Sequence, residues 1–294
     1  MPPESEFPLQ SLTAARVVVV AGKGGVGKTT VTAVIARAAS NAGRRVLVVE
    51  LDGKPTLAGL VPGIEVMTIA APDALDEYLR DHGFARIAKR LNRTGVIDVV
   101  GTAAPGIDDI VVLGKIKQLE RSDSYDLIVV DGPAAGHAIT FLTSAAGLAD
   151  AVSSGPVRAQ ADEVLALLHD PGRCQVVLVT LPETTPVNEV VETAYALEDE
   201  VGVQLGPVVV NGVDVGEPLP DHDAAERAVA DLDPSLAQAL LDAAEFRRAR
   251  RAMEAGEIAR LAEELPIPKV TLPARPAAGL TPEDIDELAE VLGR

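Results

Sequence analysis

The feature that most constrains this chain is the stretch from Val17 to Thr30, which reads VVVVAGKGGVGKTT. Four consecutive valines predict a strand that is buried on both faces of a parallel sheet. The glycines that follow let the backbone curl, and Lys28-Thr29 opens a predicted helix whose apolar residues fall on one stripe. A strand, a glycine loop and a helix N-terminus in this order bring unpaired backbone N–H groups and the positive helix end to one point. The stretch therefore predicts an anion site at the edge of a sheet.

The spacing within this stretch indicates which anion binds. Gly22-x-x-x-x-Gly27-Lys28-Thr29 is the P-loop pattern, in which the lysine reaches phosphate oxygens and the hydroxyl ligates Mg²⁺. The glycines also spell G-x-G-x-x-G, with Glu50 and Asp52 near the offset of a ribose-binding carboxylate in a dinucleotide fold. Lys28-Thr29 favours the P-loop, because a dinucleotide turn has no use for a buried cation facing a pyrophosphate. The predicted ATP-binding residues of the loop are Gly22, Lys23, Gly24, Gly25, Val26, Gly27, Lys28, Thr29 and Thr30.

The rest of the chain alternates predicted strands with predicted helices. This order predicts an α/β fold, a doubly wound and mostly parallel sheet with helices on both faces. We expect residues 1–16 to form an N-terminal tail and residues 17–294 a single P-loop ATPase domain, with helical insertions at about 84–119 and 137–168. The last helix opens with a capping box, Thr281-Pro282-Glu283-Asp284. The predicted strands are 45–51, 64–69, 126–131, 175–181, 207–211 and 268–272; the later helices are 107–119, 137–152, 157–168, 187–201, 223–265 (broken near Asp233-Pro234) and 281–292.

Charge and cysteine content exclude several classes of function. The net charge is 26 − 44 = −18, which argues against general binding to nucleic acid or anionic lipid. An arginine cluster at 247–251 is the local exception, and we interpret it as a solvated or salt-bridged helix face. The single Cys174 excludes an intramolecular disulfide and any zinc or iron–sulfur site built on this chain's own thiolates. No signal peptide or run of transmembrane length is present, so we expect a cytoplasmic protein without stable membrane insertion.

Polar residues end three of the predicted strands, where a parallel sheet binds its ligands. Asp131 is a candidate Mg²⁺ ligand of the Walker-B type, or else a turn residue. Asp52 is a candidate for orienting or deprotonating the attacking water, and with Thr29 and Asp131 it completes the candidate metal set; its alternative is an Asp-Gly turn. Asn211 either reads the nucleotide base with its amide or merely ends its strand.

The string from Gly22 to Thr30 resembles the deviant P-loop of the signal-recognition and MinD-type ATPases, in which the lysine at position 23 reaches across a dimer interface. Further segments resemble the arsenite-pump ATPase and tail-anchored-protein targeting family. Gly136-His137 resembles its second switch, and Pro182 to Val187 with Glu189 and Glu192 its mid-chain signature. Asn211 and the loop from Pro273 and Ala274 to Gly279 match the positions that contact adenine in that family.

This resemblance implies a Mg²⁺-dependent dimeric switch that binds and hydrolyses ATP, with Lys23, Lys28 and Asp52 as catalytic residues and an unknown client protein. Both a homodimer and a paralogous heterodimer remain open. The two switches read Asp52-Gly53-Lys54-Pro55-Thr56 and Gly132-Pro133-Ala134-Ala135. They lack hydroxyls that the family carries there, which predicts slow hydrolysis. The family's zinc-binding and arsenite-binding cysteines are absent. Alternative functions are a ParA- or MinD-like positioning ATPase, which the acidic charge disfavours, and a weakly hydrolysing scaffold in a heterodimer.

A client surface is expected in the inserted helices, because their apolar residues exceed what one buried stripe needs. The alternative is ordinary packing against the sheet. The residues concerned are Ile107, Ile110, Val111, Leu113 and Ile116.

Overall fold

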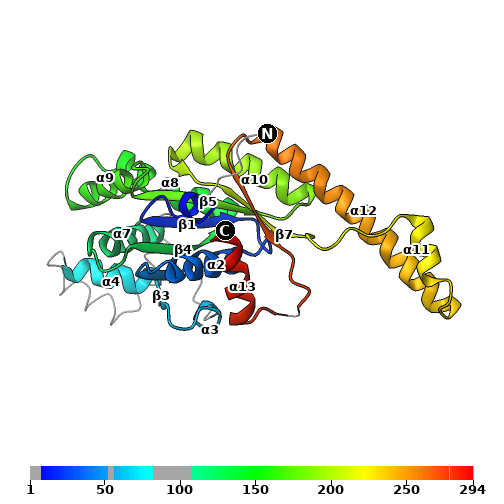
Figure 1. The fold of residues 1–294 in the computed structure, drawn as a ribbon. Helices are drawn as coiled ribbons and strands as arrows, with labels where there is room; N and C mark the ends of the chain where they lie inside the picture. Colours follow the sequence, from blue (N-terminus) through cyan, green and yellow to red (C-terminus); the bar gives the residue numbers. More distant parts are fainter. Residues whose placement is uncertain (1–7, 52–55, 82–106, 278, 294) are drawn as a thin grey trace.

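The computed structural model describes residues 8–51, 56–81, 107–277 and 279–293. Within these ranges the strands form one sheet in the order β3-β2-β4-β1-β5-β7-β8, and β6 pairs with β5 outside this order (Figure 1). Every described strand pairing is parallel. The predicted α/β fold is confirmed, and β1 lies at the centre of the sheet. The glycine loop therefore leaves the sheet from its middle.

The inner strands are buried on both faces, as their runs of valine, isoleucine and leucine predict. All residues of β1, β2 and β5 are buried, whereas β3, at the edge, has exposed ends. The two-residue β6 carries too little pattern to be predicted from the sequence. The strands are β1 (Val17–Gly22), β2 (Val46–Glu50), β3 (Glu65–Thr68), β4 (Leu127–Ala134), β5 (Cys174–Thr180), β6 (Gln204–Leu205), β7 (Val208–Val213) and β8 (Lys269–Pro273).

The valines of β1 alternate between two helical layers, because successive side chains of a strand point to opposite faces. Val18 and Val20 pack against α1 (Pro8–Leu12), α2 (Lys28–Asn41), α3 (Leu57–Leu60) and α13 (Pro282–Leu292). Val17 and Val19 belong to the core of the other face. That layer comprises α4 (Ala71–Asp81), α7 (Ile107–Arg121), α8 (Ala135–Ala151), α9 (Pro156–Leu168), α10 (Thr184–Ala196), the π-helical segment η1 (Leu197–Val201) and, through Leu261, the end of α12.

Three local features refine the sequence-based expectations. Residues 8–12 form α1, whose Leu12 is fully buried and whose carbonyl accepts a hydrogen bond from Gln175 Nε2 at 2.7 Å. The capping box of α13 is confirmed, with Thr281 and Asp284 exchanging hydrogen bonds. Cys174 begins β5 and is buried, which raises the pKa of its thiol to about 12.

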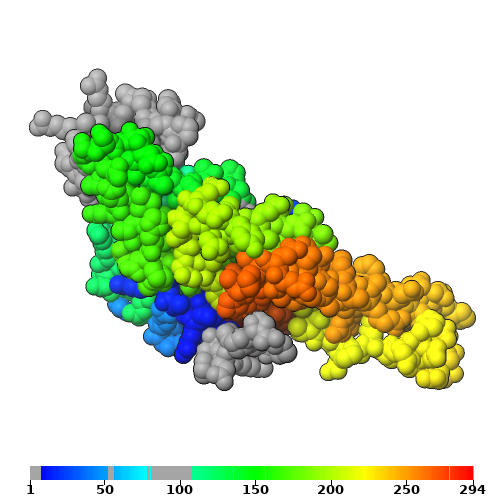
Figure 2. Space-filling view, turned by 90° about the horizontal axis from the view of Figure 1, so that it is seen from above, coloured from blue at the N-terminus to red at the C-terminus, as the bar shows by residue number. Residues whose placement is uncertain are grey.

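Two helices, α11 (His222–Val229) and α12 (Pro234–Glu264), form an arm that projects from the body (Figures 1 and 2). The break between them falls at the predicted position, where the Asp233 carboxylate caps α12 by accepting from the Ser235 and Leu236 amides. With 31 residues, α12 is about 47 Å long. Its C-terminal part lies along α10, held by hydrogen bonds from Thr184 to Glu257 and from Tyr195 to the Glu264 carbonyl. Its N-terminal part leaves the body. None of the described helices is long and apolar enough to cross a membrane.

Candidate nucleotide site

Glycine is required in the loop between β1 and α2 for two different reasons. Gly25 and Gly27 have φ angles of 87° and 90°, in the left-handed region that other residues avoid. A Cβ on Gly22 would lie 2.3 Å from the carbonyl oxygen of Val179 on β5, so the chain passes directly against its neighbouring strand. A Cβ on Gly24 or Gly25, in contrast, would meet no atom of the described residues within 4 Å. The loop is thus tight against the sheet at one end and open at its centre, as a cradle for a ligand must be.

The N-terminus of α2 supplies donors to this cradle. Among the described residues no side chain caps α2, and its N-cap position is taken by Gly27. The first hydrogen bond of the helix runs from the Val31 amide to the Gly27 carbonyl at 2.9 Å. The amides of Lys28, Thr29 and Thr30 therefore have no acceptor within the helix. Together with the helix dipole they favour an anion at this position. Val26, the one apolar loop residue, is buried.

Two of the predicted metal ligands lie side by side. Thr29 Oγ1 donates a hydrogen bond of 2.8 Å to Asp131 Oδ2, and Thr32 Oγ1 is 3.4 Å from the other carboxylate oxygen. The parallel register of β1 and β4, which pairs Val20 with Asp131, causes this proximity. Mg²⁺ in nucleotide sites takes one or two protein oxygens together with phosphates and water. In the described ranges no group of three or more His, Cys, Asp or Glu could hold a metal ion. Thr29 Oγ1 and Asp131 Oδ2 fit the one or two protein oxygens of such a nucleotide-bound ion.

The two lysines of the loop point in different directions. Lys28 Nζ donates to the backbone carbonyl of Lys23 at 3.2 Å, so it stays over the loop. Lys23 Nζ instead forms an ion pair with Glu189 Oε1 of α10 at 2.5 Å. Both partners of this pair are about one third exposed, at 34% and 38%. The sequence marks Glu189 only through the mid-chain signature of the resembled family. It contains no signal that Glu189 pairs with Lys23.

Asn211, on β7, also contacts the glycine loop. This residue lies within β7, and its Nδ2 donates a hydrogen bond of 2.9 Å to the Val26 carbonyl. A Cβ on Gly27 would lie 2.3 Å from the same nitrogen. One of the two amide hydrogens therefore braces the loop, a role that neither sequence-based interpretation included.

Pro273 and Ala274, predicted to contact a nucleotide base, line a cavity of about 670 Å³ beside Asn211. The Ala274 amide donates to the Val213 carbonyl at 2.9 Å, which ties the end of β8 to the end of β7. The cavity thus lies at the same edge of the sheet as the glycine loop. Pro273 and Ala274 line this cavity, while Asn211 directly precedes its lining residue Gly212.

The base of the arm forms another wall of this cavity. Arg247 donates two hydrogen bonds to Asp214, at 2.6 and 2.7 Å, and these hold the pKa of the Asp214 carboxyl well below its usual range. Arg250 pairs with Glu254 at 2.9 Å, and the Glu254 carboxylate accepts from the Asp214 amide at 3.2 Å. The salt-bridged interpretation of the arginine cluster is therefore correct for Arg247 and Arg250. The sequence contained no signal for the pairing of Arg247 with Asp214, because the two lie 33 residues apart, whereas Glu254 follows Arg250 at the i,i+4 spacing of a helix.

The first switch is described only at its edges. Asp52, the candidate catalytic and metal-binding residue, lies outside the described residues, as do positions 53–55. Glu50, two residues earlier, ends β2 opposite Asp131 in the sheet register and is buried. Its Oε1 accepts the Leu57 amide at 3.0 Å, at the start of α3. This carboxylate is committed to a backbone amide, which argues against the ribose-binding role of the dinucleotide interpretation.

The second switch borders a cavity of about 420 Å³ between β2, β4, α7 and α8. Its apolar lining residues include Leu51, Val112 and Phe141, and its polar lining residues include Asp109 and His137. Burial, and then repulsion by Asp108, raises the pKa of Asp109. The Gly136-His137 pair belongs to the first turn of α8.

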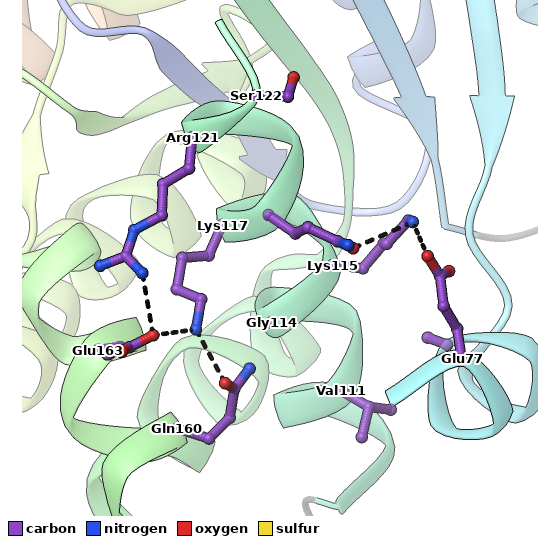
Figure 3. Close-up of a pocket in the computed structure, with 11 residues that line it drawn as sticks. Glu77, Val111, Gly114, Lys115, Lys117, Arg121, Ser122, Gln160 and Glu163 are labelled. Carbon is purple, nitrogen blue, oxygen red and sulfur yellow. Dashed lines mark hydrogen bonds and ion pairs between the residues drawn. The ribbon is translucent and has the colours of Figure 1, made fainter. Parts of the chain in front are cut away.

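A further cavity of about 420 Å³ lies between α4, α7 and α9 (Figure 3). Lys117 is buried there and contacts Gln160 at 2.8 Å and Glu163 at 2.5 Å, while Lys115 pairs with Glu77 at 2.5 Å. The hydrogen bond from Lys117 lowers the pKa of Glu163. Each of these lysines thus has a carboxylate partner, and the cluster joins three helices.

The apolar residues of α7 that suggested a client surface also pack inside the chain. Ile110, Val111, Leu113 and Ile116 are all buried, whereas the side chain of Ile107 lies outside the described part of the structure. For these four residues the structure supports packing against the sheet.

Comparison with known proteins agrees with this geometry. Residues 15–154 match the family model described as anion-transporting ATPase. ATPase BagA of Mycobacterium tuberculosis is 32% identical, over 96% of this chain and 94% of the relative. The chain belongs to the anion-transporting ATPase family. The arsenical pump-driving ATPase of Escherichia coli is 29% identical over 68% of this chain and 35% of the relative.

Family membership confirms the resemblance inferred from the motifs. The matched residues 15–154 include the glycine loop, Thr29 and Asp131. The match thus covers the loop and the two candidate metal ligands, whereas Asn211, Pro273 and Ala274 lie outside it.

Proposed function

We propose that this chain binds ATP with Mg²⁺ and hydrolyses it, acting as a nucleotide-dependent switch on a partner protein. The observation that carries this proposal is the uncapped N-terminus of α2 directly above the Thr29–Asp131 hydrogen bond. It places backbone donors for phosphate and oxygen ligands for a cation within one small site. Membership of the anion-transporting ATPase family supports the same function.

Each residue has a separate task in this proposal. The amides of the glycine loop and of the first turn of α2 hold the phosphates, and Lys28 neutralises their charge. Thr29 and Asp131 would hold Mg²⁺, which when bound stabilises charge that develops on the phosphate oxygens. Asp52 orients or deprotonates the attacking water. Asn211, Pro273 and Ala274 form the site of the base.

A calorimetric titration of ATP with Mg²⁺ tests this assignment. Lys28→Ala removes the charge that faces the phosphates and should weaken ATP binding by at least about tenfold, since charge-assisted contacts contribute roughly 1.5–3 kcal/mol. Lys115→Ala is the matched control, because Lys115 pairs with Glu77 and lies on α7, outside the proposed site. Equal affinity of the two variants would show that the site has been wrongly assigned.

We further infer that the switch works as a dimer whose two nucleotide sites face each other. Lys23 supports this inference, because its ammonium group is turned away from its own loop and is held by Glu189 at the surface. Two cations in one loop repel each other unless one points away. A second subunit that docks at this edge would present a phosphate to the exposed lysine. Its partner there is either a second copy or a related chain.

Substitution of Lys23 tests the dimer separately from ATP binding. Lys23→Ala should leave the ATP affinity of the isolated subunit nearly unchanged, while ATP-dependent dimerisation in light scattering and most turnover are lost. Glu189→Gln is the companion variant: it frees the lysine without removing it and should retain dimerisation. A Lys23→Ala protein that dimerises and hydrolyses normally would remove the ground for the dimeric mechanism. Turnover below detection in the wild-type chain, with intact binding, would favour the scaffold alternative.

A further inference from the structure

The arm exposes an apolar helix face along the N-terminal part of α12. Leu236, Leu240 and Phe246 are 50%, 45% and 69% exposed, and between Pro234 and Met253 no residue of α12 is buried. At 100° per residue these side chains fall within an arc of about 120°. We call this surface the arm face; it consists of Leu236, Ala239, Leu240, Ala243 and Phe246.

The arm face differs from ordinary scattered apolar exposure. Single exposed leucines are common on protein surfaces and need no explanation. Here they share one side of a helix that leaves the body, and the packing of α11 on α12 buries little, since Ala225 is the one buried residue of α11. Helices gain most of their stability from burying an apolar face. An uncovered face on a long projecting helix therefore indicates a binding surface.

The arm begins at the nucleotide edge of the sheet. Thr184, at the N-terminus of α10, contacts Glu257, and Asp214, just after β7, holds Arg247. Residues 234–246 therefore extend about 20 Å beyond these contacts. Figure 1 shows this part of α12, with α11, standing clear of the sheet and of the other helices.

Charge indicates what covers the arm face. Residues 221–246 contain seven acidic side chains and one arginine, a net charge of −6. The remainder of the chain carries −18 − (−6) = −12. A second copy would thus bring an acidic arm against an acidic body, and an anionic lipid surface would be repelled as well. Charge complementarity favours a basic partner with an apolar stripe of its own.

We propose that the arm face binds a basic amphipathic helix of another protein. Its apolar stripe packs on Leu236, Leu240 and Phe246, while a lysine or arginine pairs with Asp242, which borders the arm face next to Phe246. The arm face spans eleven residues from Leu236 to Phe246, about 15 Å, which matches roughly three helical turns of such a partner. This helix would belong to the partner of the proposed switch. The inference rests on the proposed function only in that identification of the partner.

The test measures binding of a synthetic peptide to the full chain without nucleotide. The probe is a fluorescent helix of about four turns built from leucine and lysine at amphipathic spacing, followed by anisotropy. Leu236→Ser with Leu240→Ser should weaken binding about tenfold, and Asp242→Asn severalfold, with lower salt sensitivity. The matched controls are Val157→Ser, which removes an exposed apolar side chain of α9, and Asp199→Asn, which removes an exposed charge of η1. Both controls should bind as the wild type does.

Several outcomes overturn the proposal. These are absence of binding by the wild-type chain, equal affinity of arm and control variants, and equal binding of a peptide with glutamate in place of lysine. Light scattering supplies a further one: if the chain self-associates and Leu236→Ser with Leu240→Ser abolishes this, the arm face belongs to a second copy. ATP titration of the same samples keeps the two proposals apart. A chain that binds the peptide through its arm and fails to bind ATP contradicts the proposed function alone.

Discussion

Gly22→Ala introduces one methyl group where β1 runs directly against β5. The added Cβ would lie 2.3 Å from the Val179 carbonyl oxygen and 3.2 Å from Val26 Cγ2. An ordinary contact between a carbon and an oxygen needs more than 3 Å. The two central strands must therefore separate by close to 1 Å at this point, or the loop must leave its position. The obstacle is backbone within a buried sheet, so no flexible side chain can move aside.

The cost follows from this geometry. Overpacking a well-packed interior costs about 1–3 kcal/mol, and the upper part of that range applies because backbone has to move. A loss of about 3 kcal/mol is a large fraction of the roughly 5–15 kcal/mol that stabilises a typical domain. It lowers the melting temperature by about 5 °C in a chain of this size. ATP binding should fall as well, because the displaced loop no longer presents its amides together.

Urea unfolding of three variants separates this steric cost from other effects. Gly24→Ala has open space and an ordinary φ, so its stability should remain within about 0.5 kcal/mol of wild type. Gly25→Ala has the same space but a φ of 87°, which costs about 1–2 kcal/mol of backbone strain. Gly22→Ala should be the least stable of the three, with an unchanged dependence on urea. If Gly22→Ala and Gly24→Ala unfold at the same urea concentration, the close approach of the loop to β5 is wrong.

Three further predictions address the cation, the hydrolytic step and the dependence on pH. Asp131→Asn and Thr29→Val should each remove most of the Mg²⁺-dependent gain in ATP affinity, and the double variant should lose little more, because both side chains serve one ion; additive losses in calorimetry would contradict this. Asp52→Asn should retain ATP while turnover collapses, and turnover that survives would reduce Asp52 to a turn residue. Asp126 accepts hydrogen bonds from the Arg45 side chain and amide at 2.7 and 2.8 Å, and its pKa is lowered to about 2. Since the folded state holds this proton less tightly than the unfolded state, with a pKa of about 3.9, the contribution is present above about pH 4 and is lost as pH falls to about 2. Asp126→Asn should therefore flatten the urea midpoint over this range, and an unchanged slope would refute the assignment.

Much of the fold was predictable because its signals are local. The buried strands are nearly continuous aliphatic runs, the break before α12 is marked by Asp233-Pro234, and the start of α13 is marked by a capping box. The glycine loop combines a spacing and two side chains that only a phosphate site requires. Thr29 and Asp131 could be grouped in advance because the P-loop and the aspartate that ends a predicted strand are both expected at the carboxyl edge of a parallel sheet.

The remaining contacts join positions that are far apart in the chain and carry no local pattern. Lys23 and Glu189 are separated by 166 residues, and Asp214 and Arg247 by 33. The sequence left two roles open for Asn211, contact with a base or the end of its strand, because an amide suits several partners. In the fold its Nδ2 donates to the Val26 carbonyl. The arm face is the clearest case. Its leucines have the spacing of a helix that packs on a core, and only the tertiary structure reveals that α12 leaves the body before it reaches one.

Cys174 has a practical consequence for studying this protein. It is the single cysteine in the sequence, it is buried in β5, and with a thiol pKa of about 12 it holds almost no thiolate near neutral pH. Because the thiolate is the species that reacts with maleimides, the natural chain already behaves as a cysteine-free background. One cysteine placed at an exposed arm position such as Gln238, and another on α9, would each take a probe without removal of the native Cys174. The distance between a probe on the arm and a probe on the body can therefore be measured by spectroscopy without altering the core.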